Sequence, residues 1–214
     1  MFYFVKTPGW IKKLYPDRVW EIETAEKNIY LSFDDGPHPK ITLRVLNELK
    51  QYNALATFFC IGKNVLAYPD IYKKIIDEGH TVGNHTYSHL NGWKTNDGIY
   101  LDDIALAKKY IDTKFFRPAY GKITSFQHRQ LSGIKYQLKT VMWSVLSGDF
   151  DHSISPHECL ENVLLNATSG SIIVFHDSTK AEERLLYALP KVLEHYAKKG
   201  YTFKRILKEK ENQP

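Results

Sequence analysis

The polar residues best suited to chemistry in this chain each follow a short apolar run. They are Asp34 and Asp35 after 29–33, His85 and His89 after 81–82, Arg117 after 115–116, Asp149 after 140–146, and His176 after 171–175. Apolar runs bounded by Gly and Pro are typical of buried strands. The carboxyl ends of the strands in a parallel sheet or barrel share one face. These side chains could therefore converge, and together they are typical of a metal-assisted hydrolase.

The two histidines have the spacing of a metal-binding pair. His85 and His89 lie four residues apart, so one helical turn or a tight loop can direct both imidazoles at one ion. Two histidines and one carboxylate form a common hydrolytic zinc site that leaves positions open for water and substrate. The spacing alone also fits solvated or core histidines. Thr86 excludes the HExxH motif of thermolysin-type enzymes, which needs glutamate at that position.

The adjacent carboxylates offer two different roles. At a strand end, one of Asp34 and Asp35 can ligate a metal while the other accepts a proton from the attacking water. A metal lowers the pKa of bound water from about 15.7 towards about 7, and a nearby carboxylate can complete the activation. The pair is also compatible with a plain loop turn, because Gly36-Pro37 follows it.

Three further polar residues complete an acid–base set. His176 could protonate the leaving amine. Arg117 and Asp149 are natural supports, one anchoring the base and the other orienting the acid histidine. All three are therefore candidate catalytic residues.

Composition limits the class of protein. The 214 residues suit one domain with a sizeable core, and 43% of them are hydrophobic. The net charge of +5 comes without an arginine-rich run, a helix-turn-helix or an RNA-binding pattern, so we expect no nucleic-acid partner. Attraction to an anionic polymer such as a cell wall remains open. The 14 Tyr and 4 Trp suit sugar stacking and equally suit an ordinary core.

The cysteines and the N-terminal residues bear on location. Cys60 and Cys159 have no CxxC spacing, which favours buried or free thiols in a reducing compartment. Residues 1–10 are too short for a transmembrane segment and lack a secretory cleavage site. We therefore expect a cytoplasmic protein. Residues 4–15 could lie on a membrane surface, but we favour residues 1–27 as a lead segment packed on the fold.

Helical and strand-like patterns alternate along the chain. Strands are predicted at 29–33, 56–61, 81–82, 114–117, 139–145, 171–175 and 201–206. Helices are predicted around 41–49 and at 71–77, 100–111, 124–131, 156–165 and 182–199, with Ser155 as the N-cap of the fifth. This alternation implies an α/β fold with parallel strands. A full eightfold barrel typically needs about 250 residues, so we expect a short, irregular barrel in one domain.

Five motifs give the sequence a specific resemblance. In chain order they are SFDDGP (32–37), HTYSH (85–89), RPAYG (117–121), SGDF (147–150) and VFH (174–176). Their order and spacing resemble those of the polysaccharide deacetylases, the NodB-homology enzymes of carbohydrate esterase family 4. The resemblance covers roughly residues 28–206, which places the catalytic domain at 28–214.

The resemblance implies a distorted (β/α) barrel that removes N-acetyl or O-acetyl groups from sugars. Asp34 matches the family's catalytic base. The residues that match its metal triad are Asp35, His85 and His89. The family's cofactor is one divalent ion, usually Zn²⁺, with Co²⁺ or Ni²⁺ often accepted.

The resemblance also assigns the supporting residues. Arg117 matches the arginine that tethers the base, and Asp149 matches the aspartate that tunes the acid, His176. Tyr120 matches the residue whose backbone N–H, together with the metal, stabilises the tetrahedral oxyanion.

Several positions depart from the family pattern. Ala119 replaces a common proline, and Leu146 and Phe150 replace a common aspartate and tryptophan. Phe150 can still form a wall of the groove, but the substrate preference is left open. Val174 replaces the leucine expected to line the pocket for the acetyl methyl group. Trp93, which follows the metal histidines, could stack on a sugar or simply pack.

The leading functional hypothesis is a metal-dependent deacetylase. Its partner would be an acetylated glycan or glycan precursor, such as an N-acetylglucosamine-containing glycan or peptidoglycan. One alternative is hydrolysis of a non-sugar amide on the same scaffold. Another is a catalytically silent, metal-containing glycan-binding protein, although base, ligands and acid are all present. The sequence does not indicate the oligomeric state.

Overall fold

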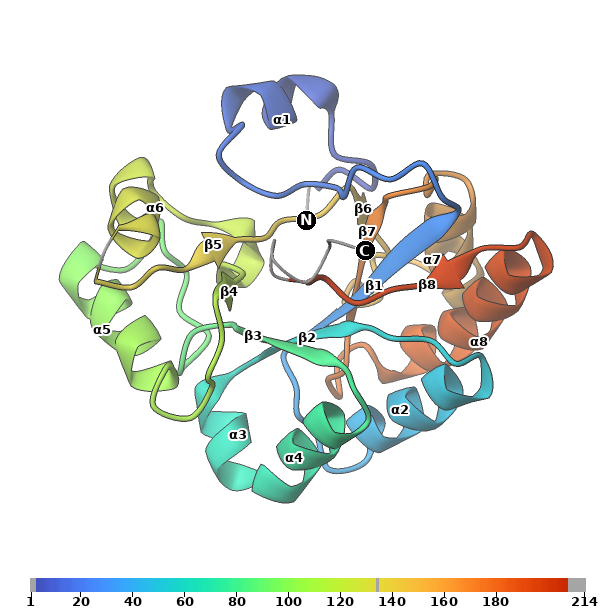
Figure 1. Ribbon diagram of the computed structural model, residues 1–214, viewed down its shortest axis with the longest axis horizontal. Helices are drawn as coiled ribbons and strands as arrows, with labels where there is room; N and C mark the ends of the chain where they lie inside the picture. The colour runs from blue at the N-terminus through green and yellow to red at the C-terminus, as the bar shows by residue number, and fades with distance from the viewer. Residues whose placement is uncertain (1–2, 134, 208–214) are drawn as a thin grey trace.

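The computed structural model describes residues 3–133 and 135–207. Figure 1 shows strands near the centre with helices around them. The strands are β1 (Asn28–Asp34), β2 (Thr57–Cys60), β3 (Thr81–Asn84), β4 (Phe115–Phe116), β5 (Lys139–Thr140), β6 (Val145–Leu146), β7 (Ile172–His176) and β8 (Thr202–Phe203). The helices are α1 (Gly9–Leu14), α2 (Ile41–Gln51), α3 (Gly62–Ala67), α4 (Pro69–Asp77), α5 (Asp97–Ala107), α6 (Ser125–Ser132), α7 (Pro156–Leu164) and α8 (Glu182–Lys198), with the 3₁₀ turn η1 (Ala119–Gly121).

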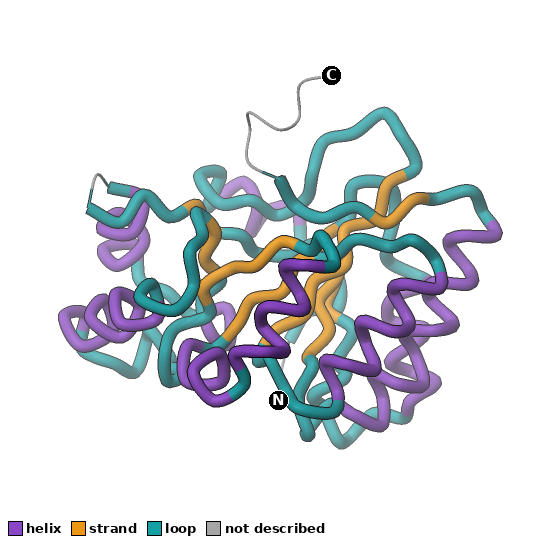
Figure 2. Tube along the Cα trace, turned by 60° about the horizontal axis from the view of Figure 1, so that its bottom comes forward, coloured by secondary structure: helices purple, strands orange, loops and turns teal. Residues whose placement is uncertain are grey.

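The strands form one curled parallel sheet. Their order is β5-β4-β3-β2-β1-β7-β6, and β8 pairs with the start of β1. The pairings between neighbouring strands are parallel. The carboxyl ends of these strands therefore lie on one face of the barrel. Figure 2 shows helices packed along the outside of the strands. The predicted short, distorted (β/α) barrel is confirmed.

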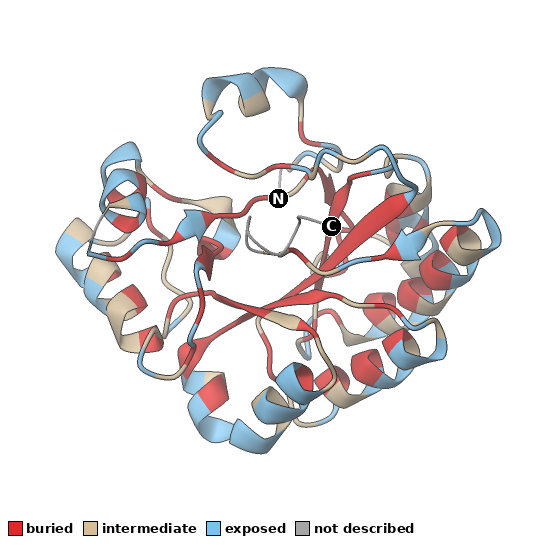
Figure 3. Cartoon of the chain, viewed as in Figure 1, coloured by how far each residue is buried: buried red, intermediate tan, exposed pale blue. Residues whose placement is uncertain are grey.

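The central strand β1 separates two parts of the core. Ile29, Leu31 and Phe33 are completely buried in the cluster that α2, α7 and α8 cover. Tyr30 belongs to a different cluster, because successive side chains of a strand point to opposite faces. Ser32 and Asp34 share the face of Tyr30, which places polar groups inside the barrel. Figure 3 shows the strands buried and the outer faces of the helices exposed.

The N-terminal segment lies along both edges of the sheet. β5 and β6 are the ends of the strand order. Lys6 forms an antiparallel bridge to Val145 in β6, and Val19 forms a parallel bridge to Val141, next to β5. Thr7 adds a hydrogen bond from its hydroxyl to the Trp143 carbonyl at 2.8 Å. The segment therefore joins the two edges that the sheet itself leaves unpaired (Figure 1).

Three elements differ from the sequence-based predictions. The single strand expected at 139–145 is divided into β5 and β6, because Arg117 and residue 19 bind the intervening backbone at Val141. Helix α1 was not predicted, since it buries none of its residues and so has no apolar periodicity. Helix α3 was also missed, because it has only six residues. Within the described ranges, no helix has the length and apolar character needed to cross a bilayer.

The N-terminus of α7 provides a test of local stability. Ser155 Oγ accepts a hydrogen bond from the Glu158 N–H, and the Glu158 carboxylate accepts one from the Ser155 N–H, as expected for the predicted cap. Ser155→Ala removes the first bond and should lower the free energy of unfolding by about 1 kcal/mol in urea denaturation. Ser153→Ala, an exposed serine outside the helix, should change it by less than about 0.5 kcal/mol. Equal losses in both variants would contradict this account.

Candidate active site

A buried arginine organises the carboxyl ends of the strands. Arg117 follows β4 and is inaccessible to solvent. Its Nη1 donates to Asp34 Oδ1 at 2.7 Å and to Ser32 Oγ at 2.8 Å. Its other nitrogens donate to the carbonyls of Val141 and Met142 at 3.2 and 2.8 Å. Every guanidinium nitrogen therefore has an acceptor, which a buried charge requires, and Asp34 is held on the barrel side of β1.

Asp35, His85 and His89 converge beside Asp34. The Asp35 Oδ1 atom lies 3.1 Å from His89 Nε2 and 3.6 Å from His85 Nε2. One possible ligand atom from each of the three residues lies within 4.8 Å of the others. The structure thus brings together the three residues that the sequence predicted as metal ligands.

The environment of His85 prepares it to act as a ligand. Its Nδ1 lies 2.8 Å from the Arg117 carbonyl oxygen; since a carbonyl can only accept, Nδ1 donates and Nε2 keeps its lone pair. Burial lowers the pKa of His85 to about 4, with the positive charge of His89 adding to the effect against the opposing Asp34 and Asp35 carboxylates. A neutral imidazole with its second nitrogen anchored is the form that binds metal ions.

Backbone hydrogen bonds hold the loop between the two histidines. The Asp103 carboxylate, in α5, accepts from the backbone N–H groups of Tyr87 and Ser88 at 2.8 and 3.0 Å. Thr86 and His89 have positive φ angles of 67° and 60°, an unusual conformation for residues other than glycine. Asp103 belongs to no motif, so the sequence offered no signal for this supporting role.

The Asp35 carboxylate is charged although it is largely enclosed. Burial acts to raise its pKa, but the contact with His89 and the charge of His176 outweigh burial and lower the pKa, and His85 adds to this effect in the acidic range where its imidazole is protonated. Its Oδ1 atom is buried without a well-formed hydrogen bond among the described residues. An anionic oxygen without a donor, facing two imidazole nitrogens, fits a divalent cation bound by one carboxylate and two histidines.

The candidate acid lies on the strand next to the base. In the register of β1 and β7, His176 stands opposite Asp34. His176 Nδ1 donates to Asp149 Oδ1 at 2.7 Å, and its backbone N–H donates to Asp149 Oδ2 at 2.6 Å. Burial acts to lower the pKa of His176, but the buried Asp149 carboxylate outweighs it and raises the pKa to about 9. His176 therefore carries a proton at neutral pH.

Tyr120 lies beside His89 of the candidate metal-binding set, and Phe150 lies beside the candidate acid His176. Tyr120 has a left-handed backbone with φ 59°, and its hydroxyl lies 3.2 Å from His89 Nδ1. The described part of the chain provides no acceptor for the Tyr120 backbone N–H. The Phe150 ring meets the His176 ring edge-on, with centroids 5.2 Å apart.

Val174 and Trp93 lie in contrasting surroundings. Val174 is buried on β7, on the same face of the strand as His176 two residues later. The Trp93 side chain is exposed, and its indole N–H donates to the Ile123 carbonyl at 3.1 Å. Lys122 Nζ lies 4.1 Å from the centroid of the Trp93 ring, so the side chain of Lys122 occupies one face of this aromatic platform.

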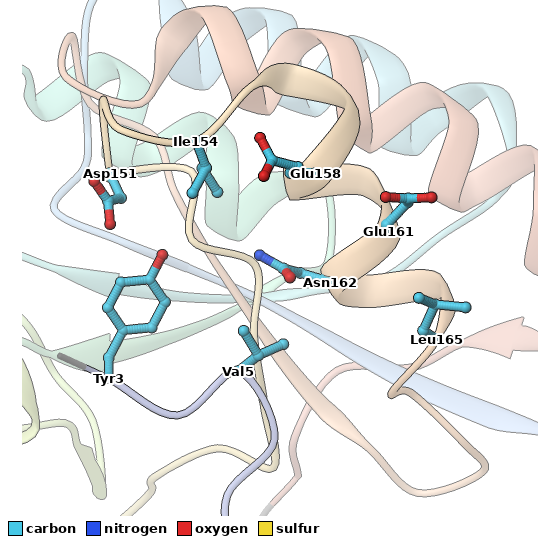
Figure 4. Close-up of a pocket in the computed structure, with 8 residues that line it drawn as sticks. All are labelled: Tyr3, Val5, Asp151, Ile154, Glu158, Glu161, Asn162 and Leu165. Carbon is cyan, nitrogen blue, oxygen red and sulfur yellow. The ribbon is translucent and has the colours of Figure 1, made fainter. Parts of the chain in front are cut away.

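A separate cavity lies beside the site. It has a volume of about 390 Å³ and lies between the N-terminal segment and α7, with Tyr3, Asp151 and Asn162 among its lining residues (Figure 4). The residues that line it include none of the candidate catalytic or metal-binding residues. The cavity adjoins the site through two aromatic rings: the centroid of the Tyr3 ring, in the cavity wall, lies 5.2 Å from the centroid of the Phe150 ring.

Comparison with known proteins places the chain in one family. The family model described as polysaccharide deacetylase matches residues 21–138. A peptidoglycan-N-acetylglucosamine deacetylase of Bacillus cereus is 37% identical over 190 residues, covering 86% of this chain and 88% of the relative. The chain belongs to the polysaccharide deacetylase family. It is accordingly a hydrolase of N-acetyl amide bonds.

Two further similarities extend the match beyond the first three motifs. A chitooligosaccharide deacetylase of Azorhizobium caulinodans is 33% identical, covering 78% of this chain and 81% of the relative. The crystal structure of the Bc1960 peptidoglycan N-acetylglucosamine deacetylase, in complex with 4-naphthalen-1-yl-N-oxidanyl-benzamide, superposes with a TM-score of 0.83. It is 33% identical, and the match covers 94% of this deacetylase and 95% of that chain.

The charge of His176 gives a pH prediction for the metal-free deacetylase. Because its folded-state pKa of about 9 exceeds the ordinary value of about 6.5, the Asp149 pair stabilises the fold fully below about pH 6.5. This stabilisation is lost as the pH rises through about 9. In Asp149→Asn the pKa of His176 should fall, because burial remains and the carboxylate that opposes it most strongly is gone, leaving only the Asp35 and Asp34 carboxylates to raise the pKa. NMR titration of the histidine measures the pKa of His176 in the wild type and in the variant. An unchanged titration midpoint in the variant would show that Asp149 does not raise this pKa.

The Arg117 network gives a stability prediction. Arg117→Leu leaves Asp34 buried without its cation and should lower the free energy of unfolding by about 3–5 kcal/mol. Arg44→Ala breaks only an exposed pair with Glu182, with N–O 3.4 Å, and should cost less than about 1 kcal/mol. Chemical denaturation compares the two variants. A similar small loss in both would show that Asp34 does not depend on Arg117.

Proposed function

We propose that this deacetylase removes the N-acetyl group from N-acetylglucosamine units of a glycan, peptidoglycan being the first candidate, with one bound Zn²⁺ ion. The convergence of Asp34, the Asp35–His85–His89 set and the Asp149-paired His176 on one face carries the proposal. Two relatives named above as peptidoglycan N-acetylglucosamine deacetylases support this choice of substrate. The chitooligosaccharide deacetylase supports N-acetylglucosamine as the sugar unit but does not favour peptidoglycan as the polymer.

The ion would be held by Asp35, His85 and His89. When bound, it would supply positive charge that polarises the acetyl carbonyl and makes water more acidic. One carboxylate and two imidazoles suit Zn²⁺; Co²⁺ or Ni²⁺ would fit the same donors.

Asp34 is the proposed general base. Arg117 and Ser32 fix one carboxylate oxygen, Oδ1, while Oδ2 lies 4.0 Å from His85 Nε2, on the side of the metal-binding set. The free oxygen is thus available to accept the proton of the attacking water. The guanidinium keeps this carboxylate in place without itself contacting the substrate.

His176 is the proposed general acid. It holds a proton at neutral pH because of Asp149, and its Nδ1 is occupied by that carboxylate. Only Nε2 is left to donate to the sugar nitrogen as the amide bond breaks. The Tyr120 N–H would donate to the oxyanion that forms on the acetyl carbon. Val174 and Phe150 would contact the acetyl group and the sugar, and Trp93 would offer a stacking surface at the edge.

Acetate release tests the proposal directly. Metal-stripped protein is resupplied with zinc and assayed on N-acetylglucosamine oligomers, peptidoglycan fragments and acetylated xylan. Asp34→Asn should lose about 10²–10⁴-fold in turnover and retain zinc. His85→Ala should lose both zinc and turnover. The surface control Asp77→Asn should behave as the wild type.

The outcomes distinguish the alternatives. Zinc-dependent release from peptidoglycan fragments alone would establish that substrate, and release from xylan would instead indicate an O-deacetylase. Zinc bound at one ion per chain without any release would favour a non-sugar amide or a silent glycan-binding protein. Near-normal activity of Asp34→Asn would refute its role as the base.

A further inference from the structure

One buried carboxylate close to the site has no part in the chemistry described above. Asp177 follows His176 and is completely inaccessible to solvent. Its Oδ2 atom accepts a hydrogen bond from the Thr42 hydroxyl of α2. Its Oδ1 atom has no hydrogen-bond partner among the described residues. Asp177 therefore lies beneath the surface of the protein.

Asp177 lies against the loop that carries the Asp35 ligand. Its backbone N–H donates to the Asp34 carbonyl at 3.1 Å. Its carboxylate fills the space beside Gly36, where any Cβ atom would collide with it. A side chain at position 36 would have to displace this carboxylate, so the loop passes close against it.

Thr42 extends the contact to the far side of the loop. Its hydroxyl donates to Asp177 and accepts the His38 backbone N–H at 2.7 Å. One hydroxyl can fill both roles because it has one hydrogen and two lone pairs. The buried pair thereby fixes the loop both at Gly36 and at His38, from two elements that lie 135 residues apart in sequence.

The loop needs such support because Asp35 is strained. Its φ angle is 80°, a left-handed conformation that is unfavourable for a residue other than glycine. From the other side, Asn64 Nδ2 donates to the Asp35 carbonyl at 2.7 Å and the Ile61 N–H donates to the Gly36 carbonyl at 2.9 Å. We infer that the Thr42–Asp177 pair is a positioning device that holds Asp35 in the conformation required for metal binding.

This inference rests on the proposed metal-dependent function, and metal affinity tests it without an activity assay. The dissociation constant for Zn²⁺ is measured by titration calorimetry with a competing chelator, and the Tm of each metal-free variant reports its folding. Asp177→Ala and Thr42→Val should each raise the Zn²⁺ dissociation constant about tenfold or more. Asp177→Asn, which still accepts the Thr42 hydroxyl, and Thr42→Ser, which restores that hydroxyl, should stay within about threefold of the wild type.

Thr113→Val is the matched control. Like Thr42, Thr113 both donates and accepts: its hydroxyl donates to the Val82 carbonyl at 2.7 Å and accepts the Phe115 N–H at 3.1 Å. Thr113 precedes β4, whereas the candidate site lies at the carboxyl ends of the strands. Loss of the Thr113 hydroxyl should therefore lower the Tm and leave the zinc affinity unchanged. Equal weakening by Thr113→Val and Thr42→Val would reduce the effect to general destabilisation and overturn the inference.

The remaining outcomes are also decisive. Folded Asp177→Ala and Thr42→Val proteins with the wild-type zinc affinity would overturn the inference and leave the proposed function intact. If Asp177→Ala fails to fold, the milder Thr42→Val and its Thr42→Ser counterpart decide the question. A wild-type chain that binds no zinc would instead overturn the metal dependence of the proposed function, and the inference with it.

Discussion

The buried Arg117 guanidinium is the interaction on which the rest of the site depends. A cation inside a barrel must recover the solvation that it loses, and burial does lower the pKa of Arg117 against the opposing effect of Asp34. Its side chain binds β1 through Asp34 and Ser32 and binds the backbone between β5 and β6. Its own carbonyl orients His85. One residue thus fixes the proposed base, the proposed metal-binding set and the edge of the barrel.

Two histidines near Asp34, His85 and His176, are suited to opposite proposed roles. His85 has no close anionic hydrogen-bond partner at Nδ1, and burial keeps it neutral, as a metal ligand must be. His176 donates to a completely buried carboxylate and keeps its proton, as an acid must. The difference arises from the acceptor at Nδ1: a neutral carbonyl for His85 and the charged Asp149 for His176. The environment assigns the two roles.

Backbone strain is concentrated around the same site. Among the described residues, the non-glycine positions with a left-handed backbone include Asp35, Thr86, His89 and Tyr120. Each belongs to a candidate ligand, a ligand loop or the proposed oxyanion donor. Strain of this kind persists only where surrounding contacts over-determine the conformation. The contacts of Asp103 with the histidine loop, and of Asn64 and Asp177 with the aspartate loop, provide that constraint.

The sequence by itself determined the alternation of strands and helices, the cap at Ser155 and the strand ends at which the polar motifs stand. These features are local, because side-chain periodicity and cap chemistry act over a few residues. The tertiary structure alone decided that His176 stands opposite Asp34, that the segment 139–145 breaks into two strands, and that residues 6 and 19 join the edges of the barrel. The tertiary structure also brings the Thr42 hydroxyl into hydrogen-bonding contact with the Asp177 carboxylate. Strand register, edge pairing and contacts between buried polar groups join distant parts of the chain, and local sequence patterns carry no information about which distant partner satisfies a buried group.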